Sequence, residues 1–143
     1  MGGQQKQYVA ALDVGTTSVR CHVFDERIEP VGVSSRSVEV LSPKPGHMEI
    51  DPDGLWNSIL SVIPEAMHAA GLTLDGVALK GLGICTQRGT FITWDKHTGI
   101  PFHNLITWQD FRAEHYARTQ NSSFIFKVCY CLSLWVVFVL IMG

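Results

Sequence analysis

The chain has 143 residues, of which 46% are hydrophobic and 17% charged, and its formal net charge is −2. This length and composition indicate a folded domain with a core of its own and exclude a disordered chain. The near-neutral charge, with no cluster of Lys and Arg, argues against a nucleic-acid partner. Four cysteines are too few for a disulfide scaffold, and Cys21 and Cys85 lie in apolar runs that predict buried thiols in a reducing compartment.

The first forty residues predict three strands joined by short turns, over 8–14, 19–24 and 31–40. The first is an apolar run too short for an ordinary helix, and the third carries β-branched residues at every second position. Short turns between successive strands predict an antiparallel meander.

A helix is predicted next, because the apolar residues between 55 and 70 recur at spacings of one, three and four. Asp51 or Asp53 is expected to cap its first turn, with Pro52 near the start, and Gly71 to end it. Trp56, on this helix, and Trp94, further along, are expected in the core.

Further strands are predicted over 77–85, where the run is apolar enough for a buried strand, over 90–95 and over 105–108. A polar helix is expected over 109–119. The order β-β-β-α-β-β-β-α predicts the α/β class, with a mixed sheet and helices packed on it.

The turn between the first two strands has the most informative chemistry, and it reads Asp13-Val14-Gly15-Thr16-Thr17-Ser18-Val19-Arg20. A glycine lets the backbone approach a ligand, and three successive hydroxyl residues with their N–H groups are suited to line an anion site. Arg20 adds a charged donor for phosphate, and Asp13 is placed to meet Mg²⁺ directly or through water. From local chemistry alone, the alternative is a hairpin turn with an acid at its base.

Residues 8–24 resemble the first phosphate-binding hairpin of the sugar-kinase, hexokinase and actin superfamily, and more narrowly that of the FGGY family of carbohydrate kinases. Three later stretches resemble the glycerol-kinase branch of that family in the same order, and the resemblance covers about 8–118. Their central motifs are Pro43-Lys44-Pro45-Gly46 followed by Glu49, Asp51, Pro52 and Trp56; Gly83-Ile84-Cys85-Thr86-Gln87-Arg88-Gly89-Thr90; and Trp94 to Pro101 with Asn104, Ile106, Trp108, Gln109 and Arg112.

The resemblance implies a ribonuclease-H-like mixed sheet, of which this chain holds an incomplete first domain, and it implies ATP and Mg²⁺ as cofactors. A polyol or sugar would be the small-molecule partner. The resemblance assigns the nucleotide phosphates to Asp13, Gly15, Thr16, Thr17, Ser18 and Arg20, with Asp13 also at the metal. It assigns the polyol hydroxyls to Arg88 and the polyol carbons to Trp108.

Two departures from the family pattern affect the expected function. Glycerol kinases have a glutamate after the arginine of the Gln-Arg motif, and Gly89 stands there in this chain, so the identity of the acceptor is left open. The family's general base has no matching residue here, so no catalytic residue is assigned. The resemblance implies that the family carries out ATP-dependent phosphorylation of glycerol or a related polyol or sugar, and this chain alone is expected to be inactive. The alternative is an inactive binding or regulatory module that associates with the full-length kinase through its sheet edge.

The chain is expected to divide into a flexible start over 1–7, a partial kinase domain over 8–122 and an apolar tail over 123–143. Residues 124–142 carry one charge, Lys127, and three explanations stand for them. They are the end of a truncated product such as an alternative transcript, a membrane anchor of about the required 20 residues, or a core strand. The polar start has no signal sequence, so a cytoplasmic location is expected, with tail anchoring in a membrane as the alternative.

Overall fold

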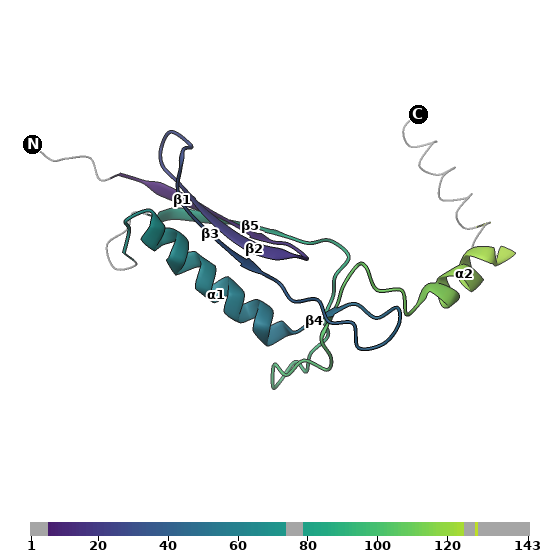
Figure 1. Cartoon of the computed structure of the whole chain (residues 1–143). Coiled ribbons are helices and arrows are strands. Elements are labelled where there is room, and N and C mark those ends of the chain that lie inside the picture. Colours follow the sequence, from purple (N-terminus) through teal and green to yellow (C-terminus); the bar gives the residue numbers. More distant parts are fainter. Residues whose placement is uncertain (1–5, 74–78, 125–127, 129–143) are drawn as a thin grey trace, which may run out of the picture. The chain divides into compact units, whose positions relative to one another are not determined.

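The computed structural model describes residues 6–73, 79–124 and 128. The chain divides into two units, Met1–Gln109 and Asp110–Gly143. The first unit contains a four-stranded sheet with one long helix, as Figure 1 shows, and a small two-stranded sheet. The second contains a short helix, α2, over Glu114–Ser122.

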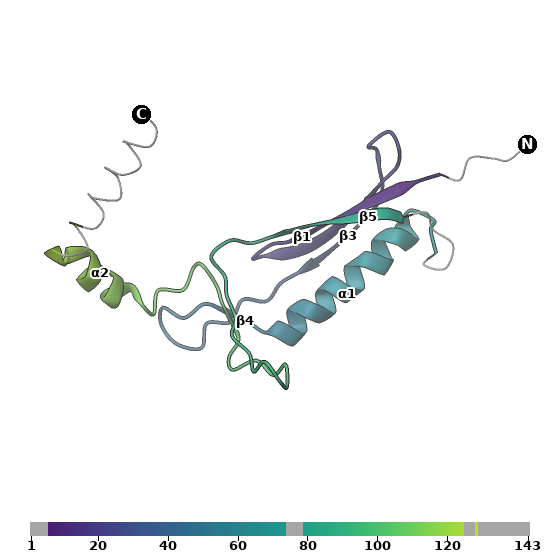
Figure 2. The same cartoon turned by 180° about the vertical axis from the view of Figure 1, so that it is seen from behind.

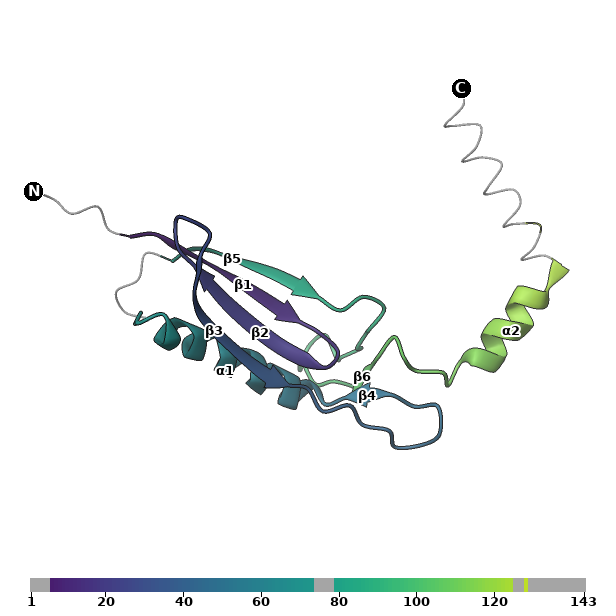
Figure 3. The same ribbon diagram turned by 45° about the horizontal axis from the view of Figure 1, so that its top comes forward.

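The four-stranded sheet has the order β3-β2-β1-β5 (Figure 3). Its strands are β1 over Tyr8–Val14, β2 over Ser18–Phe24, β3 over Pro30–Ser37 and β5 over Leu79–Thr86. The first three pair antiparallel, which confirms the predicted meander, and β5 pairs with β1 in parallel. The predicted mixed α/β sheet is therefore confirmed.

Helix α1, over Pro52–Ala69, lies along one face of this sheet and packs against β2 and β3 (Figures 1 and 2). Asp51 is its N-cap, because a carboxylate oxygen accepts the Gly54 N–H at 2.8 Å. The chain leaves the helix at Ala70, and Gly71 follows with φ +70°, a conformation that favours glycine. Of the two predicted caps the structure uses Asp51, and the predicted end at Gly71 is confirmed.

The core lies between α1 and the sheet, where every second residue of β1 and β2 is buried. Its members are Ala10, Leu12, Val14, Val19, Cys21 and Val23 from the strands and Val62, Ala66 and Met67 from the helix. Gly32 of β3 passes so close to α1 that a Cβ there would lie 2.1 Å from the Ala66 carbonyl oxygen. The helix and strand therefore approach at a distance that only a glycine allows.

The small sheet joins β4, over Glu49–Ile50, to β6, over Leu105–Ile106. The predicted strand over 90–95 was wrong, since Phe91 and Trp94 each form only an isolated bridge among the described residues. A turn forms instead, because one Asp95 carboxylate oxygen accepts the N–H groups of His97 and Thr98 at 2.8 and 2.7 Å. These hydrogen bonds hold the pKa of Asp95 below its usual range.

The predicted burial of β5, Cys85, Trp56 and Trp94 was also wrong. Strand β5 is exposed over nearly its whole length, because α1 packs against β2 and β3 instead. Cys85 on that strand is therefore exposed, whereas Cys21 is buried as predicted. Trp56 and Trp94 are each 57% exposed and so lie outside the core.

In the second unit, α2 begins at Glu114, five residues after the predicted start at residue 109. The Asp110 carboxylate accepts the Arg112 backbone N–H at 3.0 Å and also binds its guanidinium, with contacts of 2.8 and 2.7 Å. This local pair forms a turn that competes with a helical start.

No helix among the described residues is long and apolar enough to cross a membrane. The apolar segment expected over 124–142 falls mostly outside the described residues, which end at 124 apart from residue 128.

Candidate functional site

The turn between β1 and β2 is narrow and tightly closed. The Gly15 N–H donates to the Ser18 carbonyl oxygen at 2.9 Å, and a Cβ at Gly15 would lie 3.0 Å from that same oxygen. The Thr17 carbonyl oxygen accepts the Val38 N–H at 2.9 Å, which ties the turn to the segment after β3. The turn is thus held by its own backbone and leaves its hydroxyl side chains for other contacts.

Asp13 and Arg20 flank this turn as directly paired residues of β1 and β2. Both are exposed, because they point away from the face that α1 covers. Among the described residues no ion pair joins them to each other or to a third group. The turn is therefore flanked by a carboxylate and a guanidinium that form no ion pair within the described part of the chain.

The parallel pairing of β1 and β5 brings the Gln-Arg motif to the same place. Val14 pairs with Thr86, and the Gln87 N–H donates to the Val14 carbonyl oxygen at 2.9 Å. Because the carboxyl ends of parallel strands meet at one edge of a sheet, Arg88 emerges beside the phosphate turn. Two motifs more than 70 residues apart in the sequence thus share one site.

Hydrogen bonds link the turn to Gln87, which precedes Arg88, and to Trp108. The Thr16 hydroxyl donates to the Gln87 Oε1 at 2.7 Å, and Thr90 donates to the same oxygen at 3.1 Å. The Trp108 indole Nε1–H donates to the Thr16 Oγ1 at 3.0 Å. Trp108 is 92 residues away from Thr16 in the sequence, so this contact depends on the tertiary fold.

Gly89 adopts φ +72°, which a residue with a side chain rarely adopts. A Cβ there would also lie 3.2 Å from the Trp108 Cβ. The backbone conformation and the neighbouring tryptophan both favour a residue without a side chain at this position. The geometry of this loop therefore favours Gly89 over the glutamate that glycerol kinases have at this position.

These residues surround an open pocket of about 700 Å³. It is lined by Asp13, Gly15, Thr16, Thr86, Gln87, Arg88, Gly89 and Trp108. Five of the expected site residues thus meet there, whereas Thr17, Ser18 and Arg20 are not among the lining residues. Thr86 and Gln87 were not assigned a role from the sequence, although Gln87 stands beside Arg88 in the quoted motif.

Within the described residues, no three His, Cys, Asp or Glu side chains are grouped to hold a metal ion. Asp13 is the carboxylate in the pocket. One carboxylate fits Mg²⁺ that is shared with phosphate oxygens and waters, which is the usual arrangement where the metal accompanies a nucleotide. It does not fit a metal held by protein ligands alone.

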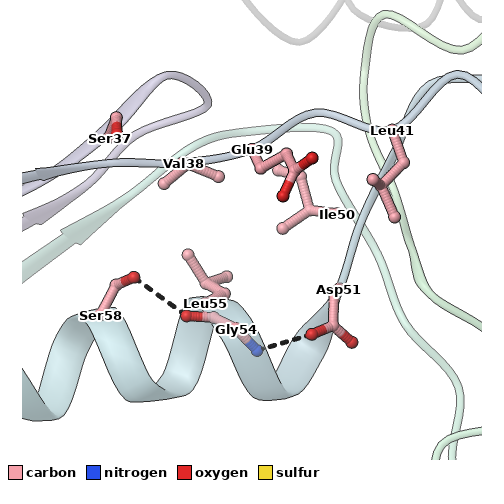
Figure 4. Close-up of a pocket in the computed structure, with 9 residues that line it drawn as sticks. All are labelled: Ser37, Val38, Glu39, Leu41, Ile50, Asp51, Gly54, Leu55 and Ser58. Carbon is pink, nitrogen blue, oxygen red and sulfur yellow. Dashed lines mark hydrogen bonds between the residues drawn. The ribbon is translucent and has the colours of Figure 1, made fainter.

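A second cavity, of about 230 Å³, lies between the segment after β3 and the start of α1 (Figure 4). None of the expected site residues lines it. Two of its polar side chains are used within the helix, where the Asp51 carboxylate accepts the Gly54 N–H and the Ser58 hydroxyl donates to the Gly54 carbonyl oxygen at 2.9 Å. This cavity borders the start of α1 and shares no lining residue with the pocket beside the phosphate turn.

The family model for the N-terminal domain of the FGGY family of carbohydrate kinases matches residues 8–133. The chain belongs to the FGGY family. Among curated relatives, glycerol kinase 5 of Gallus gallus is 48% identical over 131 residues, which are 92% of this chain and 25% of the relative. Glycerol kinase of Rhizobium rhizogenes is 44% identical over 116 residues, which are 81% of this chain and 22% of the relative.

A solved structure of Plasmodium falciparum glycerol kinase with ADP matches with a TM-score of 0.76 at 27% identity. The match covers 87% of this chain and 24% of that structure. The expected fold family is therefore confirmed. The chain spans about a quarter of the length of the FGGY relatives it matches.

Proposed function

We propose that this chain supplies the phosphate-binding turn and part of the acceptor site for ATP-dependent phosphorylation of glycerol or a related polyol or sugar. The observation that carries this proposal is the single pocket that holds Asp13, Gly15 and Thr16 together with Arg88 and Trp108. The resemblance to glycerol kinases, one of them solved with ADP, supports the same conclusion.

On the nucleotide side, the turn offers backbone N–H groups and the hydroxyls of Thr17 and Ser18, with Arg20 as the charged donor. Phosphoryl transfer depends mainly on positioning the phosphates and on neutralising their charge. A turn with these donors can contribute to both. Asp13 is the residue that would hold Mg²⁺, which would neutralise negative charge on the phosphates.

On the acceptor side, Arg88 offers a fork of N–H donors to hydroxyl oxygens. Trp108, 58% exposed, offers an apolar ring face to the carbons of a polyol. No described residue is matched to a general base, so we expect this chain by itself to bind nucleotide without turning over an acceptor.

The first test is isothermal titration calorimetry of Mg·ATP into the full chain. Arg20→Ala removes a charged hydrogen-bond donor at the turn, and we expect it to weaken binding about tenfold or more. Arg27→Ala is the matched control, because it removes the same charge from an exposed position in the turn between β2 and β3. That variant should retain the affinity of the unaltered chain.

Equal weakening by both variants would show that ATP senses only the overall charge, and it would contradict a specific site. Absence of binding to a chain with the circular-dichroism spectrum of a folded protein would also refute the proposal. Acceptor phosphorylation by the purified chain would refute the expected lack of turnover.

A further inference from the structure

The Thr16 hydroxyl is fully engaged as a donor. A threonine hydroxyl has one proton and two lone pairs. Its proton goes to the Gln87 Oε1 at 2.7 Å, and one lone pair accepts the Trp108 Nε1–H at 3.0 Å. We propose that Thr16 is a positioning residue that orients the Trp108 indole, an inference that rests on the proposed function because it concerns the same pocket.

The Trp108 side chain needs such an anchor, because it is 58% exposed and so receives little packing. Its backbone is already fixed by the preceding residue. Thr107 is 3% exposed, and both its N–H and its hydroxyl donate to the Met48 carbonyl oxygen, at 3.0 and 3.1 Å. The indole N–H has a single proton, and its bond to Thr16 fixes the direction in which the ring lies.

Gln87 sets the direction of the Thr16 hydroxyl. Its Oε1 accepts from Thr16 and from Thr90, and its backbone N–H continues the ladder between β1 and β5. With the hydroxyl proton directed at Gln87, a lone pair of Oγ1 is left for the indole. The orientation of Trp108 therefore depends on the sheet through two successive hydrogen bonds.

The same hydrogen bonds separate the roles of the two threonines in the turn. Thr16 has no proton left for a phosphate oxygen while it donates to Gln87, so its hydroxyl is not a phosphate donor in this state. Thr17 is exposed and its hydroxyl has no partner among the described residues. The turn thus uses one threonine to place the acceptor-side indole and leaves the next one for the nucleotide side.

The test is the indole N–H signal of Trp108 in ¹⁵N-labelled full chain without any ligand. The chain has four tryptophans, and Trp108→Phe identifies the signal that belongs to Trp108. We expect that N–H to exchange with water about tenfold more slowly than a free indole, because it is hydrogen-bonded. Thr16→Val, which keeps the shape but removes the hydroxyl, should shift the signal and abolish the slow exchange.

Two variants separate positioning from a general structural role. Thr16→Ser retains the hydroxyl and should restore both the shift and the slow exchange. Thr17→Val alters the same turn one residue further on and should leave the Trp108 signal unchanged. The dispersion of the backbone amide signals in the same spectrum reports whether each variant is folded.

Fast exchange of the Trp108 N–H in the unaltered chain would overturn the proposal without any variant. So would an unchanged signal in Thr16→Val, or an equal shift in Thr17→Val. Because no nucleotide is present, these outcomes are independent of whether Mg·ATP binds. Failure of the proposed function and failure of this inference are therefore distinguishable.

Discussion

The face of the sheet beneath α1 and the opposite face are built from alternate residues of the same strands, but their side chains meet different surroundings. Beneath α1, Leu12 and Val14 are 4% and 6% exposed. Between them, Asp13 points to the opposite face and lines the open pocket. Because strand residues alternate between faces, the core and the site are fixed by one register, and a shift by one residue would exchange them.

The strands therefore gain their stability from packing on one face, while polar side chains on the opposite face remain available to bind a ligand. Substitutions beneath α1 should change the free energy of unfolding, whereas matched substitutions on the other face should change it little. Three measurements test this division.

The largest effect is expected from Gly32→Ala on β3. The new Cβ would lie 2.1 Å from the Ala66 carbonyl oxygen and 2.7 Å from the Ala70 nitrogen, so α1 would have to move off the sheet. We expect a loss of about 3 kcal/mol or more in the free energy of unfolding, measured by urea denaturation.

Gly83→Ala is the matched control on β5. The nearest atom to a Cβ there is the Ala10 carbonyl oxygen at 3.9 Å, which is ordinary contact. The change should stay within about 0.5 kcal/mol. A loss of stability in Gly32→Ala as small as that in Gly83→Ala would mean that α1 does not approach β3 as closely as the structure shows.

The second measurement compares two thiols on opposite faces. Cys21 is fully buried beneath α1, and burial raises the pKa of its thiol, whereas Cys85 on β5 is exposed. With iodoacetamide, followed by peptide mass spectrometry, we expect Cys21 to react about 100-fold more slowly than Cys85, since it reacts only when the core opens. In urea above the unfolding midpoint the two rates should converge.

Fast labelling of both Cys21 and Cys85 in the folded chain would contradict the covered face. Slow labelling of Cys85 as well would instead mean that another segment covers β5 in solution. The rate for Cys21 thus tests whether α1 covers one face of the sheet, and the rate for Cys85 tests whether β5 is exposed.

The elements that form the covered face were easier to predict from the sequence than β5 was. Strands β1 and β2 and helix α1 follow from local patterns, and Asp51 and Gly71 mark the ends of the helix correctly. The exposure of β5 was not predictable in this way. An apolar run shows that a strand is fit for burial, but whether it is buried depends on which elements pack against it, and α1 lies over β2 and β3.

In the site, the residue types that indicate phosphate chemistry, Asp13 and Arg20, were identified from the turn itself. The meeting of that turn with Arg88 depends on the parallel pairing of β1 and β5, which no local pattern specifies. The hydrogen bonds that join Thr16 to Gln87 and to Trp108 span 71 and 92 residues, so they were found only in the structure.

The smallest effect concerns a polar contact at the edge of the covered face. Glu65 of α1 binds Arg36 and accepts the Ser34 hydroxyl at 2.6 Å, both from β3. The hydrogen bond from Arg36, followed by that from Ser34, holds the pKa of Glu65 below its usual 4.5. Because the pKa of this carboxylate is lower in the folded than in the unfolded state, its ionised form stabilises the fold at pH values above the unfolded-state pKa. This contribution is lost as the pH falls through the folded-state pKa.

Glu65→Gln should therefore be slightly less stable than the unaltered chain at pH 7, and the difference should shrink as the pH falls below about 4.5, the usual carboxyl value. The effect stays small because Arg36 and Glu65 retain 53% and 41% of their side-chain exposure. Urea denaturation at pH 7 and pH 3 measures it, with Glu39→Gln as a control that removes an exposed carboxylate without a bond between α1 and β3. A deficit in Glu65→Gln that is the same at both pH values would show that Glu65 acts through packing and not through its charge.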